Sequence, residues 1–233
     1  MIRAVIFDMF ETLITHFDSP LYMGHQIAAE AGIAEPVFRE VWDTTDDART
    51  LGQMTLEEVI ETVLRRNGRY TEELYETIIR KRKASKAECF RHLHPEILPM
   101  LEGIREKGLK TGLITNCYFE ERDVIRDSVL MPYFEAVCMS CELGMMKPEH
   151  GIFRRCMNGL DVKPEECLYV GDGGSRELET ARELGMHPVQ AVWYFDKNPR
   201  AVRKAEFEQA ESPMVLMEKI SMPETDEVYI WKR

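Results

Sequence analysis

The chain has 233 residues, 44% of them hydrophobic, and a formal net charge of −11 from 41 acidic and 30 basic residues. Its length fits one large domain or one domain with a substantial insertion, and its apolar fraction is sufficient for a core. The acidic balance disfavours nucleic acid and anionic membranes as partners, and the sequence shows neither a membrane-spanning run nor a signal peptide, which predicts a cytoplasmic protein.

The first predicted element is a short strand, Ala4–Phe7, followed directly by Asp8. Four consecutive apolar residues suit a central strand of a parallel sheet. Ligands of open parallel sheets bind at the carboxyl ends of the strands, which is where Asp8 would stand. Asp8 is therefore a candidate nucleophile, although an isolated aspartate here is more simply a turn or helix-cap residue.

Residues 16–92 show no strand pattern and are predicted to form four helices. Apolar side chains at helical spacing mark them near 21–31, 37–42, 56–64 and 74–79. Thr55 and Glu58 form a capping box, and the basic cluster 80–83 is interpreted as a solvated helix face. We therefore expect this helical module to interrupt an α/β core made of residues 1–15 and 93–233.

The rest of the chain alternates short apolar runs with helical patterns. Further strands are predicted at 109–115, 136–139, 167–170 and 189–193. Helices lie between them, with ends expected at Gly108, Gly159 and Gly185. The predicted fold class is α/β, a doubly wound parallel sheet of Rossmann-like type, with an inserted all-α helical module.

Three further polar groups follow predicted strands. Thr115 and Asn116 end the second strand, Lys147 comes after the third, and the loop 171–175 with Glu177 follows the fourth. Each alone has an ordinary explanation as a turn or a surface charge. Together with Asp8, in this order, they form a much stronger signal for one shared site at the edge of the sheet.

These four motifs resemble those of the haloacid dehalogenase superfamily, over essentially the whole chain. The resemblance implies a Rossmann-like core, an aspartyl-enzyme intermediate on Asp8 and usually Mg²⁺, with residues 16–92 as a helical cap. The metal ligands it implies are Asp8, the carbonyl of Phe10 and Asp172, while Glu177 would hold a metal-bound water. The phosphate would then be contacted by a set of five residues: Thr12, Thr115, Asn116, Lys147 and Gly173.

The physical chemistry supports these roles. An aspartate nucleophile divides phosphoryl transfer into two steps, but its carboxylate repels a phosphate dianion. A divalent cation with oxygen ligands, together with Lys147, would supply the positive charge that the reaction needs. Thr115 and the Asn116 amide would donate hydrogen bonds to the phosphoryl oxygens.

Phe10 departs from the phosphatase pattern, in which a second aspartate two residues after the nucleophile handles the leaving-group proton. General acid–base catalysis is typically worth ~10²–10⁴-fold, so its loss should slow hydrolysis or favour good leaving groups. Glu11 and His16 are candidates for a surrogate acid or base. Lys86 and other lysines of the module invite comparison with Schiff-base relatives, but their charged surroundings give no sign of a desolvated pocket.

Three functions therefore stay open. The favoured one is an Mg²⁺-dependent phosphatase that acts on a small phosphorylated metabolite, as a monomer or homodimer. An aromatic residue near position 10 also suits a metal-independent 2-haloacid dehalogenase, whereas Asp172 and Glu177 favour a metal site. The third is a catalytically weak module that binds a phosphorylated ligand or a protein.

Overall fold

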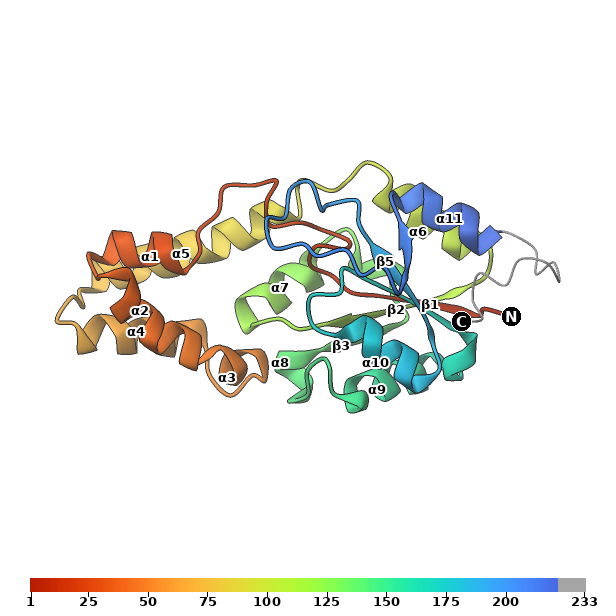
Figure 1. The fold of residues 1–233 in the computed structure, drawn as a ribbon. Coiled ribbons are helices and arrows are strands. Elements are labelled where there is room, and N and C mark those ends of the chain that lie inside the picture. The colour runs from red at the N-terminus through yellow and green to blue at the C-terminus, as the bar shows by residue number, and fades with distance from the viewer. Residues whose placement is uncertain (222–233) are drawn as a thin grey trace.

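Six parallel strands form the centre of the protein in the computed structural model, which describes residues 1–221 (Figure 1). Their order across the sheet is β3-β2-β1-β4-β5-β6, which confirms the predicted doubly wound fold class. The central strands are buried on both faces, as their apolar sequences require. The strands are β1 (Ala4–Phe7), β2 (Lys110–Thr115), β3 (Ala136–Met139), β4 (Cys167–Gly171), β5 (His187–Ala191) and β6 (Glu208–Ala210).

The order of the strands reverses around β1, which pairs with β2 on one side and β4 on the other. Phe7 lies opposite Leu113 of β2 and Val170 of β4. This register brings the carboxyl ends of three strands together at one edge of the sheet. The loops that follow β1, β2 and β4 therefore leave the sheet side by side, at the position where such folds bind ligands.

Helices cover both faces of the sheet (Figure 1). Side chains alternate along β1, so that Val5 and Phe7 belong to one apolar cluster and Ala4 and Ile6 to the other. The first cluster includes α6 (Ile97–Glu106), α7 (Phe119–Asp127) and α11 (Pro213–Ser221), and the second includes α9 (His150–Leu160) and α10 (Glu177–Leu184). The short helices are α8 (Ser140–Leu143), η1 (Met131–Tyr133) and η2 (Pro164–Glu166).

Five helices lie to one side of the sheet and form what we call the helical module (Figure 1). They are α1 (Gly24–Ala31), α2 (Glu35–Thr44), α3 (Asp46–Thr50), α4 (Leu56–Arg66) and α5 (Glu72–Cys89). An apolar cluster of their own, which includes Phe38, Ile60 and Ile78, holds them together. The capping box is confirmed, since the Glu58 carboxylate accepts the Thr55 N–H at 2.8 Å and the Thr55 hydroxyl accepts the Glu58 N–H at 3.2 Å.

The structure corrects several of the predicted elements. The module contains a fifth helix, α3, too short to show an apolar period, and the core contains α7, α11 and the edge strand β6, whose patterns are weak. Helix α9 continues through Gly159 and ends at Leu160, because Asp161 adopts the left-handed conformation expected of a glycine. The predicted end at Gly185 is confirmed. Part of the predicted core, residues 222–233, lies outside the described residues.

The basic cluster 80–83 is only partly a solvated face. Lys81 and Lys83 are exposed and pair with acids of the module. Arg82 is 2% exposed, and its Nε lies 3.5 Å from the Glu120 carboxylate of α7. The solvated-face interpretation was wrong for Arg82, because α5 lies against α7 on that side.

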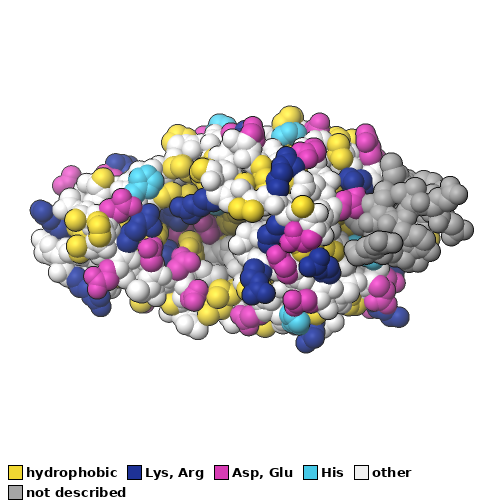
Figure 2. Space-filling view, in the orientation of Figure 1, with side chains coloured by type: hydrophobic (Ala, Val, Ile, Leu, Met, Phe, Trp, Pro, Cys, Tyr) yellow, Lys and Arg dark blue, Asp and Glu magenta, His cyan; other side chains and the backbone are white. Residues whose placement is uncertain are grey.

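The helical module contacts the core at two places. Helix α5 runs beside α7, and a groove of about 550 Å³ follows their junction. Figure 2 shows one face of the molecule, with a hollow between the module and the core. On the surface seen there, Lys and Arg side chains are interspersed with Asp and Glu. The second contact is made by the loop after α3, where Gly52 packs against the Cys141 carbonyl of α8. Within residues 1–221, no helix combines the length and apolarity needed to cross a membrane.

Replacement of Gly52 by alanine should reveal the second contact. Gly52 has φ 69°, and an added Cβ would overlap the Cys141 carbonyl oxygen; Gly68 has φ 63° with no atom within 4 Å of such a Cβ. Gly68→Ala should cost only the left-handed penalty, about 1–2 kcal/mol, whereas Gly52→Ala should cost a further ~1–3 kcal/mol from overpacking. Urea unfolding monitored by circular dichroism measures both. Equal losses for the two variants would show that Gly52 does not seat the module on the core.

Candidate active site

Asp8 stands at the reversal point of the sheet, directly after β1. Its N–H donates to the Val170 carbonyl at 2.9 Å, which continues the β1–β4 ladder by one residue and fixes the backbone. Its side chain is almost closed off from solvent, and the residue is 6% exposed. Lys147, which is 3% exposed, places its Nζ 2.5 Å from Asp8 Oδ1. The predicted pairing of these two residues is thus present as a buried ion pair.

Asn116 holds Lys147 in place. Its Oδ1 accepts the Lys147 N–H at 2.8 Å, and its Nδ2 donates to the Lys147 carbonyl at 3.0 Å. The loop after β2 is thereby tied to the loop that carries the lysine. We predicted that the Asn116 amide donates to phosphoryl oxygens; in this structure the side-chain amide instead bonds to the backbone of Lys147.

Three carboxylates from two loops converge at Asp8. Oxygen atoms of Asp8, Asp172 and Glu177 all lie within 4.8 Å of one another. Burial raises the pKa of Asp172 to about 8, and the charges of Glu177 and Asp8 add to this effect. Burial likewise raises the pKa of Asp8 to about 6, although Lys147 opposes it. Converging oxygen ligands that repel one another suit a hard divalent cation.

Lys147 balances part of this negative charge. Burial by itself would lower its pKa, but Asp8 and Glu177 outweigh burial and raise it. The lysine therefore stays protonated. One positive charge among three carboxylates leaves an excess of negative charge, which is consistent with a site for a further cation.

Glu177 also shapes the loop after β4. Its Oε1 accepts the Gly173 N–H and its Oε2 the Ser175 N–H, each at 2.7 Å, while Asp172 Oδ1 accepts the Gly174 N–H at 2.9 Å. Gly173, with φ 94°, makes the turn possible. The predicted contact of Gly173 with phosphate stays a prediction; in this structure its N–H donates to Glu177.

The two predicted threonines, Thr12 and Thr115, are buried. Thr12 Oγ1 is buried without a hydrogen-bond partner among the described residues, and Thr115 Oγ1 has only a 3.5 Å contact with the Asn116 carbonyl. The Thr12 carbonyl accepts the indole N–H of Trp193 at 2.8 Å. The anchoring role of Trp193 was not predicted; an aromatic residue at the end of the predicted strand 189–193 was the available signal.

The aromatic ring of Phe10 stacks on His16, with centroids 4.7 Å apart. Glu11 has φ 58°, and its carboxylate accepts the Thr15 hydroxyl at 2.6 Å and the His16 N–H at 3.0 Å. Both predicted surrogates thus belong to one small network beside Phe10. The assignment of Glu11 or His16 as the acid or base stays a prediction.

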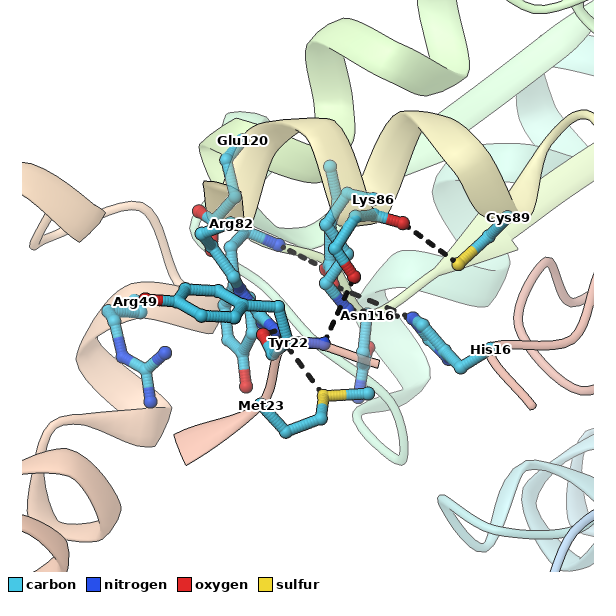
Figure 3. A network of polar contacts seen from close by, with 12 residues as sticks. His16, Tyr22, Met23, Arg49, Arg82, Lys86, Cys89, Asn116 and Glu120 are labelled. Atoms are coloured by element: carbon cyan, nitrogen blue, oxygen red, sulfur yellow. Dashed lines mark hydrogen bonds and ion pairs between the residues drawn. The ribbon is translucent and has the colours of Figure 1, made fainter. Parts of the chain in front are cut away.

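Lys86 of α5 joins the same network (Figure 3). It is 4% exposed, with its Nζ 2.7 Å from His16 Nε2 and 2.5 Å from Glu121 Oε1 of α7. Burial and the nearby Arg82 lower the pKa of Lys86. Burial opposes ionisation of Glu121, but Lys86 and Arg82 lower the pKa of this acid to about 2. The expectation that Lys86 lacks a desolvated environment was therefore wrong.

Comparison with characterised proteins agrees with this geometry. The chain matches the haloacid dehalogenase-like hydrolase family over residues 2–185. It is 34% identical to a glyceraldehyde 3-phosphate phosphatase of Methanopyrus kandleri over 111 residues, 46% of this chain and 47% of that protein. It is 31% identical to bifunctional epoxide hydrolase 2 of Rattus norvegicus over 107 residues, 44% of this chain. The matches thus span about half of the first relative and 19% of the second.

Solved structures show the same fold. A HAD phosphatase from Thermococcus onnurineus superimposes with a TM-score of 0.62 at 20% identity, covering 94% of this chain and 98% of that one. A 2-haloacid dehalogenase from Pseudomonas syringae pv. tomato DC3000 gives 0.68 at 19% identity, covering 95% and 99%. Since the family match spans most of the chain and the fold agrees with it, the chain belongs to the haloacid dehalogenase-like hydrolases.

Proposed function

We propose that this hydrolase cleaves small phosphomonoesters through an aspartyl-phosphate on Asp8. The observation that carries the proposal is the buried Asp8–Lys147 pair, with the carboxylates of Asp172 and Glu177 converging on it. The similarity to phosphatases supports the same reaction class. The substrate would be a small phosphorylated metabolite.

The reaction would proceed in two steps, formation of the aspartyl-phosphate and its hydrolysis. A carboxylate oxygen of Asp8 attacks phosphorus, the bond to the ester oxygen breaks, and the leaving alcohol takes its proton from the surrogate acid, Glu11 or His16, or from water. Water then attacks phosphorus of the acyl phosphate, which releases inorganic phosphate and restores the carboxylate. Lys147 would hold positive charge beside the transferred group throughout, and the hydroxyls of Thr12 and Thr115 would donate to its oxygens.

A bound Mg²⁺ would offset the repulsion between the carboxylates and the phosphate. Oxygen atoms of Asp8, Asp172 and Glu177 lie within 4.8 Å of one another beside the single positive charge of Lys147, so the residues fit such an ion. We assign Asp8, the carbonyl of Phe10 and Asp172 as its protein ligands. Glu177 would orient a bound water in addition to shaping its loop.

We also propose that the helical module, residues 16–92, is a cap that opens and closes over the core formed by residues 1–15 and 93–233. The separate apolar cluster of the module supports this division, as does its placement beside the loops that follow β1 and β2. Closure would exclude water from the acyl phosphate except for the attacking molecule.

The first prediction concerns the leaving group. Because Phe10 cannot protonate an alkoxide, p-nitrophenyl phosphate should turn over at least ~10²-fold faster than an alkyl phosphate of similar size. Phosphate release should require Mg²⁺ and vanish in Asp8→Asn. Glu11→Gln or His16→Asn, whichever removes the surrogate acid, should slow only the alkyl ester.

Two outcomes would contradict this assignment. Equal turnover of the alkyl and aryl esters would show that the proton donor is not missing. Chelator-insensitive halide release from 2-haloacids, lost in Asp8→Asn, would establish instead the dehalogenase activity that the aromatic residue at position 10 favours.

The metal assignment has a readout that is independent of turnover. In chelator, Asp172→Asn should raise the free energy of unfolding by ~1 kcal/mol, because it removes one of the mutually repelling carboxylates. Saturating Mg²⁺ should stabilise the unmodified protein by about 2–3 kcal/mol at 100 times its dissociation constant, and Asp172→Asn much less. Glu76→Gln, an exposed charge change on α5, is the control. An equal Mg²⁺ effect on all three proteins in thermal or urea unfolding would refute the site.

A further inference from the structure

Arg49 of α3 is the most deeply buried cation of the helical module, with 0% exposure. Its Nη2 donates to the Trp42 carbonyl at 2.9 Å and to Asp46 Oδ1 at 3.1 Å. Its Nε and Nη1 are buried without a hydrogen-bond partner among the described residues. A guanidinium has five N–H donors, so three remain unused.

Such an arrangement is costly unless a ligand completes it. An unpaired buried donor costs about 1–3 kcal/mol, and more when it carries charge. Asp46 offsets little of this, because its side chain is 52% exposed and the same oxygen accepts the Tyr118 hydroxyl at 2.5 Å. The guanidinium is nevertheless held firmly, since it stacks on Trp42 at 4.1 Å and on Tyr118 at 4.5 Å.

The other buried cations at the junction already have buried acids. Lys86 pairs with Glu121, and Arg82 lies 3.5 Å from Glu120 (Figure 3). Lys147 pairs with Asp8. Among the buried cations of residues 1–221, Arg49 thus differs in having only a half-exposed acid and several unused donors. The unused N–H donors of this cation suit an anionic ligand.

Contacts link Arg49 to the reacting centre. Tyr118, on which the guanidinium stacks, follows Asn116 by two residues at the start of α7. Asn116 holds the backbone of Lys147, and Lys147 holds Asp8. Arg49 therefore belongs to the helical module but contacts the segment after β2. The same segment holds Lys147, and through it Asp8, in place.

We propose that Arg49 binds a second anionic group of the substrate, remote from the phosphate that is cleaved. The substrate class is then a small phosphomonoester that also carries a carboxylate or a second phosphate. This inference rests on the proposed phosphatase function. It adds what that function leaves open, namely which feature of the substrate the helical module recognises.

The test compares paired substrates in the full-length protein with Mg²⁺. Phosphoglycolate and 3-phosphoglycerate carry a carboxylate, while 2-hydroxyethyl phosphate and glycerol 3-phosphate are their counterparts with a hydroxyl group in its place. Arg49→Met keeps the apolar stem and removes the donors, and should lower kcat/KM for the carboxylated esters about 10- to 100-fold. The kcat/KM for the esters without a carboxylate should change less than ~3-fold, and Arg49→Lys should restore part of the loss.

Arg65→Met is the matched control. Arg65 is also paired with an acid, Glu61 at 2.7 Å, and stacked on an aromatic ring, Tyr70 at 3.9 Å, but it is exposed on α4. Arg65→Met should leave kcat/KM unchanged for both substrate classes. Equal losses for both classes in Arg49→Met would assign Arg49 to a purely structural contact between the module and the core, and would overturn the proposal.

Binding separates this inference from the phosphatase assignment. Isothermal titration of Asp8→Asn with phosphoglycolate and with 2-hydroxyethyl phosphate should show a preference for the carboxylated ligand, lost when Arg49→Met is added. That preference without turnover by the unmodified protein would refute the phosphatase assignment but support the anion site. Turnover without any preference would refute the anion site alone.

Discussion

The ion pair between Asp8 and Lys147 is the constraint on which the rest of the site depends. Both side chains are buried, and the attraction between two buried charges compensates their loss of hydration only when geometry and further hydrogen bonds are favourable. Asn116 supplies that geometry by fixing the lysine backbone, and the β1–β4 ladder fixes the aspartate. The order of the sheet matters for the same reason, because only the reversal at β1 brings these loops together.

The carboxylate cluster works against stability. Asp172 and Glu177 stand close to Asp8, and burial raises the pKa of both aspartates. The fold tolerates this because Glu177 is held by two backbone N–H groups and the carbonyl of Asp172 is held by Gln190 at 2.8 Å. A protein without a cationic ligand would gain stability by losing one of these acids, so their presence together is best explained by function.

The sequence alone was sufficient for the core of the fold and for the prediction that Asp8, Lys147 and Asp172 come together at one edge of the sheet. Asp8, Lys147 and Asp172 follow apolar runs whose pattern identifies central strands, and parallel topology brings their ends together. It was insufficient for Arg82 and Lys86, because a lysine or arginine in a charged helix looks the same whether its partner is water or a buried acid far along the chain. Helix α7 was missed for a related reason: its Glu120 and Glu121 are buried against those cations, which hides the apolar period.

The same pairing has a consequence for the helical module. Arg82 and Lys86 come from the module and Glu120 and Glu121 from the core, so the junction is held by opposite charges in a medium of low dielectric constant. Opening would hydrate all four groups, which lowers the cost of separating them. The proposed opening of the cap would therefore separate these charged groups from one another. Arg49 lies on the same side with its donors unmatched, so an anionic substrate would add the missing partner and favour the closed state. Recognition and closure would then be the same event, driven by one ion pair completed between the module and the substrate.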